Sequence, residues 1–197
     1  MNLNFDFLVI GSGLAGLSFA LKAAEFGTVA VVTKREIDEA NTSYAQGGIS
    51  GVMDLDSDSF EKHVNDTLDA GAGLNDRKAV EAMVKEGPRL ITELMDLGVN
   101  FTRENGELHL GREGGHSENR VVHAADATGW EVENVMVKNV RNHPNITVFE
   151  HHFAMELLTE HHLGKKVKYL KKIHCFGAYV LDEVTETVHR ILAKTTI

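Results

Sequence analysis

The sequence is poor in cysteine, in positive charge and in long apolar runs. Its single cysteine, Cys175, excludes an internal disulfide and any cysteine-based zinc or iron–sulfur site, and it favours a reducing, cytoplasmic compartment. Asp and Glu outnumber Lys and Arg by 29 to 20, which argues against non-specific binding to nucleic acid or anionic membranes. No apolar run is long enough to span a bilayer, and no basic segment opens the N-terminus, so we expect neither a membrane span nor a signal peptide.

The size and composition are those of one folded domain. The chain has 197 residues, of which 43% are hydrophobic and 25% are charged. Short strand-like runs alternate with helical patterns, which predicts an α/β fold with a parallel sheet and crossover helices.

The segment 5–16 carries the clearest local pattern. An apolar run at 8–10 is too short for a helix and predicts a buried parallel strand. Gly11, Gly13 and Gly16 then form G-x-G-x-x-G ahead of a helical run. In this motif the first glycine permits a tight turn, the second lets a pyrophosphate approach the backbone, and the third lets the helix pack on the strand. The pattern predicts a dinucleotide-binding turn without distinguishing FAD from NAD.

The second predicted strand, 28–33, completes a βαβ unit but lacks the usual acidic residue at its end. Many dinucleotide sites place Asp or Glu there to bind the ribose hydroxyls. Here the strand is followed by Lys34, Arg35 and Glu36. Two interpretations remain open: Glu36 binds the ribose, or the backbone and Lys34 hold the adenosine.

The rest of the chain reads as further helices and strands. Between 76 and 97 two helical runs meet near Gly87-Pro88, and we expect Pro88 in the first turn of the second helix. Asn105-Gly106 predicts a hairpin, and Asp126 or Thr128 is expected to cap the helix through Val132. The remaining predicted elements are a helix at 59–70 and strands at 121–123, 146–150, 153–158, 176–181 and 187–191. The segment 193–197 is apolar and β-prone and has no loop after it, so we expect the sequence to stop inside a secondary-structure element.

Two glycine-rich loops are candidates for ligand recognition. The loop 39–51 could bring several backbone N–H groups to a phosphate or a flavin ring, although a solvated surface loop has the same composition. The loop 111–117 embeds charged residues among glycines, which suits recognition of a small polar ligand but equally a tight exposed turn.

Histidine pairs at 151–152 and 161–162 raise the question of a metal site. Adjacent residues point to opposite faces of a strand or lie far apart on a helix, so neither pair chelates a metal by itself. We therefore predict no metal site. Cys175 carries no nucleophile motif, and the lysine-rich run 165–172 reads as a solvated face.

Five motifs occur together in the order and approximate spacing of one enzyme family. They are GSGLAG at 11–16, TK at 33–34, YAQGG at 44–48, REGGHS at 112–117 and HAADATG at 123–129. On these motifs the chain resembles the L-aspartate oxidase family of the succinate dehydrogenase and fumarate reductase flavoprotein superfamily. The resemblance implies a Rossmann-like FAD-binding domain with a parallel sheet and a small antiparallel β-meander. It also implies that 1–197 is the N-terminal part of that domain, without the capping and C-terminal helical domains.

The resemblance implies FAD as cofactor. The glycine turn would contact the pyrophosphate, Lys34 the adenosine, the loop 41–48 the ribityl chain and isoalloxazine, and Ala154 the adenine through its backbone. The implied FAD-binding residues are Gly11, Ser12, Gly13, Leu14, Ala15, Gly16, Lys34, Asn41, Thr42, Ser43, Tyr44, Ala45, Gln46, Gly47, Gly48 and Ala154. Relatives with covalent flavin carry a histidine where this chain has Asn41, so FAD is expected to be non-covalent.

The implied reaction is oxidation of L-aspartate to iminoaspartate in NAD biosynthesis, with O₂ or fumarate as electron acceptor and quinolinate synthase acting downstream. Glu113 stands where dicarboxylate dehydrogenases have an apolar aromatic residue, and a buried carboxylate there would pair with the aspartate ammonium. The proton-transfer arginine of the superfamily would lie outside this chain, so the chain alone is expected to be inactive. The alternatives are a soluble fumarate reductase or succinate dehydrogenase-like flavoprotein, and a non-catalytic nucleotide-binding module.

Overall fold

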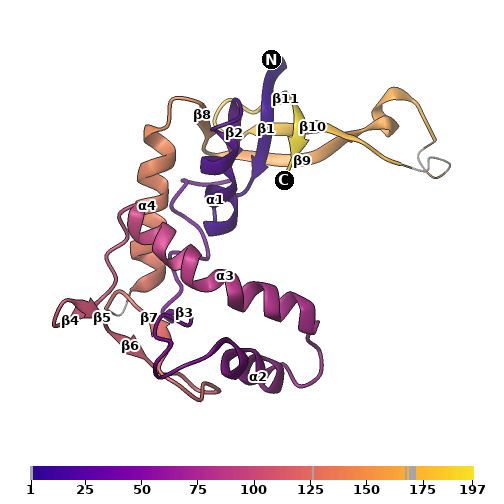
Figure 1. Cartoon of the computed structure of the whole chain (residues 1–197). Coiled ribbons are helices and arrows are strands. Elements are labelled where there is room, and N and C mark those ends of the chain that lie inside the picture. Colours follow the sequence, from indigo (N-terminus) through magenta and orange to yellow (C-terminus); the bar gives the residue numbers. More distant parts are fainter. Residues whose placement is uncertain (1, 126, 167, 169–171) are drawn as a thin grey trace. The chain divides into compact units, whose positions relative to one another are not determined.

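A computed structural model describes residues 2–125, 127–166, 168 and 172–197 (Figure 1). The chain forms two compact units. The first contains Met1–Ser43 and Met136–Ile197, and the second contains Tyr44–Val135.

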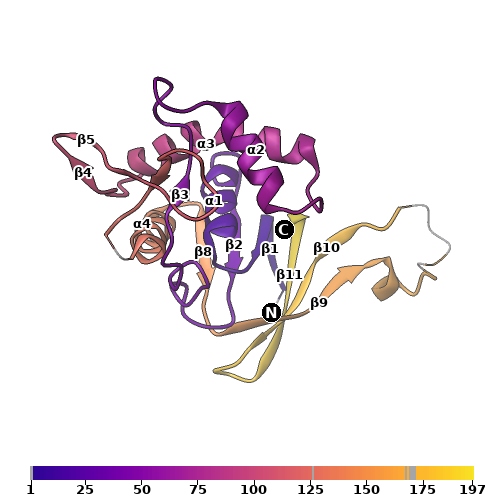
Figure 2. The ribbon, with the colours of Figure 1, turned by 90° about the horizontal axis from the view of Figure 1, so that it is seen from below.

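The first unit is built on a six-stranded sheet in the order β8-β2-β1-β11-β10-β9 (Figures 1 and 2). Its strands are β1 (Asn2–Ile10), β2 (Val29–Val32), β8 (Ile146–Phe149), β9 (His152–Thr159), β10 (Cys175–Asp182) and β11 (Thr187–Thr196). β8, β2, β1 and β11 are parallel, whereas β11, β10 and β9 form an antiparallel meander. The predicted parallel sheet with a small antiparallel β-meander is therefore confirmed.

The first crossover helix, α1 (Leu14–Ala23), links β1 to β2 and buries Leu17 and Ala20. β2 is buried along its whole length, as expected for a strand with neighbours on both sides and a helix packed on it. Residues from four strands form the buried core of the sheet. The buried members of this core are Leu8, Ala30, Val32, Ala178, Val180 and Ile191, with Phe149 and Ala154 packed against them.

β1 is longer than its apolar run predicted because most of it pairs with the end of the chain. Only 7–10 pair with β2, but the register with β11 already begins at Asn2, opposite Arg190. The distant strand therefore supplies backbone partners for residues that precede the continuous apolar run. The connection between β9 and β10 extends from the sheet as an arm, which carries a short 3₁₀ helix, η1 (Glu160–Leu163) (Figures 1 and 2).

The second unit contains two complete helices, a three-stranded sheet and a two-stranded hairpin. Its elements are α2 (Phe60–Ala70), α3 (Arg77–Asp96), β3 (Ile49–Ser50), β4 (Arg103–Glu104), β5 (Glu107–Leu108), β6 (Leu110–Gly111) and β7 (Val121–Val122). β3, β7 and β6 form an antiparallel sheet, and β4 and β5 form the hairpin that Asn105-Gly106 predicted. β3 lies inside a segment that was predicted to be entirely loop.

α3 is one continuous helix, so the prediction of two helices was wrong. Pro88 lies in its interior, where a proline lacks an N–H donor and costs about 3 kcal/mol. The helix continues because one apolar face is buried on both sides of the proline, through Val80, Val84, Ile91 and Leu94. Burial of four aliphatic side chains, each worth roughly 1.5–3 kcal/mol, outweighs the local cost.

α4 (Thr128–Asn142) begins in the second unit and ends in the first. The predicted helix is confirmed, and its apolar side chains Val132, Met136 and Val140 are buried. The Thr128 hydroxyl accepts a hydrogen bond from the Ala124 N–H, which precedes the helix, so this contact does not cap a helical N–H. Asp126, the other predicted cap, lies outside the described residues.

Candidate functional site

The turn after β1 has the geometry that its glycines predicted. Gly11 has a φ of +110°, a conformation that side chains disfavour. A Cβ added at Gly16 would overlap the carbonyl oxygen of Gly11, so the third glycine lets the helix approach the turn. At Gly13 the nearest atom to an added Cβ would be the Thr42 hydroxyl oxygen at 3.5 Å, and the approach to the backbone stays open. The turn is therefore shaped to admit a ligand beside the N-terminus of α1.

Two side-chain hydrogen bonds hold this turn. The Ser12 hydroxyl is buried and lies 3.2 Å from the Thr33 hydroxyl, which joins the carboxyl ends of β1 and β2. The N–H of Leu14 donates to Thr42 Oγ1 at 3.1 Å. Because Gly13 provides no side-chain cap for α1, Thr42 performs that role from 28 residues further along the chain.

A cavity of about 390 Å³ opens at the turn, within the first unit. It lies at the carboxyl ends of β1 and β2, which is where open α/β sheets bind nucleotides. The predicted site residues that line it together are Gly11, Ser12, Gly13, Lys34, Asn41, Thr42 and Ala154. The volume falls within the usual range for ligand pockets.

The other predicted FAD-binding residues lie elsewhere. Leu14, Ala15 and Gly16 form the first turn of α1, and Ser43 hydrogen-bonds to the Asp38 carbonyl; none of these four is among the residues that line the cavity. Five more belong to the second unit: Tyr44, Ala45, Gln46, Gly47 and Gly48. Their contacts with FAD remain predictions.

Lys34, rather than Glu36, lies at the cavity. The Glu36 carboxylate faces His151 Nε2 at 3.6 Å and does not line the cavity among the described residues. The segment after Lys34 is anchored where the Ile37 N–H donates to Glu150 Oε1 at 2.8 Å. The geometry therefore favours the interpretation in which Lys34 and the backbone hold the adenosine.

Sequence reasoning missed several residues that line the cavity. They are Ile10, Val32, Thr33, Glu39, Ala40, His152 and Phe153. The first three end parallel strands, so the rule that ligands bind at the carboxyl edge of such a sheet could have found them. No sequence signal pointed to His152 and Phe153, which reach the cavity because the chain after β8 passes the end of β2, where the His152 N–H donates to the Thr33 carbonyl at 2.9 Å.

The second unit brings three of the sequence motifs together. The N–H of Gly48 donates to Glu113 Oε1 at 3.3 Å, which links the YAQGG and REGGHS segments. The N–H of Gly129 donates to the Ala45 carbonyl at 3.0 Å, which links YAQGG to HAADATG. Glu113 itself is exposed, not buried as predicted, because the glycines that follow it provide no side-chain cover.

A buried ion network fixes the end of this loop. The Arg120 side chain is fully buried, and its Nε and Nη2 donate to the two oxygens of Asp58 at 2.8 Å. Arg120 Nη1 also contacts Asp66, which accepts hydrogen bonds from the Ser117 N–H and hydroxyl at 2.7 and 2.8 Å. Asp66 therefore ties the last residue of the REGGHS segment to the buried arginine.

The network changes the acid–base properties of its members. Burial disfavours the charged form of both aspartates, but hydrogen bonds from Arg120 and from Ser59 or Ser117, together with the charge of Arg120, outweigh it. They lower the pKa of Asp58 and of Asp66, the latter to about 2. Burial, followed by the charge of Arg120, lowers the pKa of His63. A neutral His63 packs edge-on against His116, whose Nε2 lies 3.3 Å from the Ser50 hydroxyl.

Comparison with known sequences places the chain among flavoproteins. The chain is 47% identical to a chloroplastic L-aspartate oxidase of Oryza sativa over 194 residues and 48% identical to L-aspartate oxidase 1 of Ralstonia nicotianae over 198 residues. These alignments cover 98% and 99% of this chain but 29% and 36% of the relatives. The chain thus spans about a third of the length of the curated relatives it matches.

Solved structures show the same fold. A variant of FrdA from the quinol fumarate reductase of E. coli superposes with a TM-score of 0.89 at 27% identity, covering all of this chain and 32% of FrdA. The Sdh1 complex of Mycobacterium smegmatis gives a TM-score of 0.85 at 29% identity, with 99% and 34% of the two chains covered. Among the described residues no helix combines the length and apolar character needed to cross a membrane.

The residues around the cavity fit FAD. The open backbone at Gly13, the start of α1 and the cationic Lys34 suit a dinucleotide pyrophosphate with its adenosine. The family described as "FAD binding domain" matches residues 6–197. The chain therefore belongs to the FAD binding domain family.

Proposed function

We propose that the chain forms the FAD-binding part of an L-aspartate oxidase, which converts L-aspartate to iminoaspartate. The observation that carries this proposal is the difference in similarity along nearly the whole chain. Identity reaches 47–48% with the L-aspartate oxidases of rice and Ralstonia nicotianae, but 27–29% with FrdA and Sdh1. The reaction would contribute to NAD biosynthesis, with quinolinate synthase acting on its product.

In this proposal the chain holds FAD without a covalent bond. Asn41 lines the cavity, and its amide is not a nucleophile, so no flavin bond forms there. The Gly11–Gly16 turn at the N-terminus of α1 would hold the pyrophosphate, Lys34 and the backbone of Ala154 would hold the adenosine, and residues 41–48 would hold the ribityl chain and isoalloxazine. When bound, the flavin accepts the two electrons removed from aspartate and passes them to O₂ or fumarate.

Glu113 selects the substrate. Its Oε1 accepts the Gly48 N–H, which leaves Oε2 to bind the ammonium group of aspartate. Succinate has no ammonium, so it would leave the glutamate unpaired once substrate and the rest of the enzyme cover the site.

The test is Glu113→Gln in a full-length enzyme that contains this chain. Loss of a charge-assisted hydrogen bond costs about 1.5–3 kcal/mol, so aspartate should bind roughly 10- to 150-fold more weakly. Inhibition by succinate should change less than threefold. Glu107→Gln, on the exposed β5 strand, is the matched control and should leave both ligands unaffected. Equal losses for aspartate and succinate would assign Glu113 a structural role.

A fumarate reductase or succinate dehydrogenase-like enzyme is the second candidate, favoured by the superposition on FrdA. Steady-state rates with aspartate and succinate as alternative electron donors distinguish the two enzymes. Comparable rates with both donors would overturn the first proposal. Absence of turnover with either donor, despite bound FAD, would favour a nucleotide-binding module.

We propose the cytoplasm as the compartment, because the sequence contains a single cysteine.

A further inference from the structure

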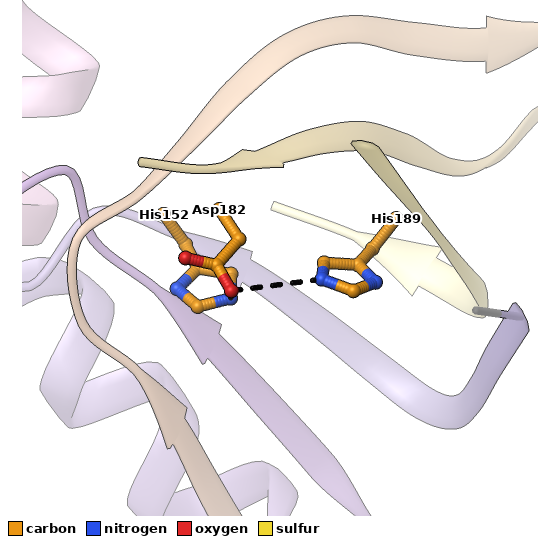
Figure 3. Close-up of side chains that lie close together, drawn as sticks. All are labelled: His152, Asp182 and His189. Atoms are coloured by element: carbon orange, nitrogen blue, oxygen red, sulfur yellow. Dashed lines mark ion pairs between the residues drawn. The ribbon is translucent and has the colours of Figure 1, made fainter. Parts of the chain in front are cut away.

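Three polar side chains meet on one face of the antiparallel meander: His152 from β9, Asp182 from β10 and His189 from β11 (Figure 3). One ligand atom from each can be chosen so that all lie within 4.8 Å of one another. The distances from Asp182 Oδ2 to the Nε2 atoms of His152 and His189 are 4.0 and 3.9 Å. Among the described residues this is the only such group of three His, Cys, Asp or Glu side chains.

The strand register explains why these residues converge. His152 is directly opposite Asp182 in the β9–β10 pair. His189 is opposite Val180, which lies two residues before Asp182 and therefore on the same face of β10. The three side chains come from three adjacent strands, and their neighbours His151 and Val188 point away from this face.

Hydrogen bonds from surrounding groups orient His152 and Asp182. The Thr185 hydroxyl donates to Asp182 Oδ2 at 2.7 Å, and Thr187 Oγ1 lies 3.2 Å from His189 Nε2. His152 Nδ1 donates to the Glu150 carbonyl at 2.6 Å, which leaves the lone pair of the neutral ring on Nε2, the atom that faces Asp182. Asp182 Oδ1 accepts the N–H groups of Val184 and Thr185 at 2.9 and 3.1 Å. Metal-ligating histidines and carboxylates characteristically have such outer partners.

The side chains are also shielded from solvent. His152 is 16% exposed, and Asp182 and His189 are each 14% exposed. The two imidazole rings lie nearly parallel, with centroids 5.9 Å apart and an interplanar angle of 21°. Side chains this enclosed and this oriented lose little conformational entropy when they bind an ion.

We propose that His152, Asp182 and His189 form a binding site for a divalent transition-metal ion, Zn²⁺ in the first instance. Two imidazoles and one carboxylate suit zinc, and three protein ligands leave the fourth position to water. Ligand atoms of tetrahedral zinc are roughly 3.3 Å apart, so the present spacing of up to 4.8 Å has to contract by at most about 1.5 Å. The ion would join three strands of the meander, and the site does not depend on the proposed enzymatic activity.

The test is titration of metal-free protein with Zn²⁺ by calorimetry, without FAD because His152 also lines the cavity. We expect one equivalent to bind with a dissociation constant of 10 μM or tighter. Co²⁺ at the same site should show the intense visible absorption of a four-coordinate ion. His189→Gln and Asp182→Asn should each weaken binding at least tenfold.

Control variants distinguish binding at this site from binding at other histidines, and a fold check distinguishes loss of the site from misfolding. His151→Gln and His161→Gln remove members of the two adjacent histidine pairs and should leave Zn²⁺ binding unchanged. Circular dichroism of the metal-free variants checks their fold, and His152→Gln replaces any variant that does not fold. Failure of the unmodified protein to bind one equivalent would overturn the proposal, and so would undiminished binding by the folded variants.

Discussion

The glycine turn of the first unit and the 112–117 loop of the second unit are held in place by opposite means. The turn depends on backbone geometry at Gly11 and Gly16, set by a motif of six consecutive residues. The loop depends on a buried arginine whose partners come from α2 and the segment before it. A site made of backbone can be recognised from a short sequence, whereas a site supported by distant side chains cannot.

Removal of the buried cation should have the largest effect. Arg120→Met leaves Asp58 and Asp66 without their partner, and Asp58 has a side chain that is only 1% exposed. Breaking one partner of a buried ion pair costs about 3–5 kcal/mol, so we expect a loss of this size in the free energy of unfolding measured with urea. Arg112→Met is the control, because Arg112 is exposed and contacts only the Ser117 carbonyl among the described groups. A similar loss in both variants would contradict the role assigned to the network.

Filling the glycine turn should have the next largest effect. Gly16→Ala places a Cβ on the Gly11 carbonyl oxygen, which belongs to rigid backbone, so we expect a cost of about 3 kcal/mol and at least tenfold weaker binding of FAD. Flavin fluorescence and urea unfolding measure the two quantities. Gly114→Ala is the control, because an added Cβ there meets no atom within 4 Å. FAD affinity unchanged by Gly16→Ala would show that the turn is not the pyrophosphate site.

The acidic members of the network predict a dependence of stability on pH. The pKa of Asp66 is lower in the folded state, at about 2, than in the unfolded chain, so the unfolded state binds more protons as the pH falls. The stabilisation is complete above about pH 4 and is lost between about pH 4 and pH 2, on the order of 2 kcal/mol for Asp66. Urea unfolding at a series of pH values measures the slope. Arg120→Met should flatten it, and an unchanged slope would assign the acid sensitivity to other carboxylates.

The smallest expected effect concerns the cap of α1. Thr42→Val keeps the shape of the side chain but removes the acceptor for the Leu14 N–H, which should cost about 1 kcal/mol of stability. Thr42→Ser restores the hydroxyl and should recover most of the loss in a thermal melt. If Thr42→Ser were as unstable as Thr42→Val, the methyl contact rather than the hydrogen bond would carry the effect.

The first unit was more predictable than the second. The βαβ unit and the turn follow from apolar runs and glycine spacing, the β-meander was implied by the family resemblance, and the cavity lies where the turn predicted it. The sequence did not reveal that Thr42 caps α1 or that His152 lines the cavity, because both depend on segments that meet only after folding. In α3, packing of a long apolar face overrode the local signal of Pro88.

The sequence by itself determined the dinucleotide turn, because G-x-G-x-x-G acts through the backbone of neighbouring residues, and its motifs pointed to the flavoprotein family. Only the tertiary structure decided which charged groups are paired and which are exposed. Arg120 is buried between two aspartates, Glu113 is exposed, and His152, Asp182 and His189 converge although 37 positions separate the first from the last. Such contacts depend on strand register and helix packing, which bring together residues that no local pattern connects.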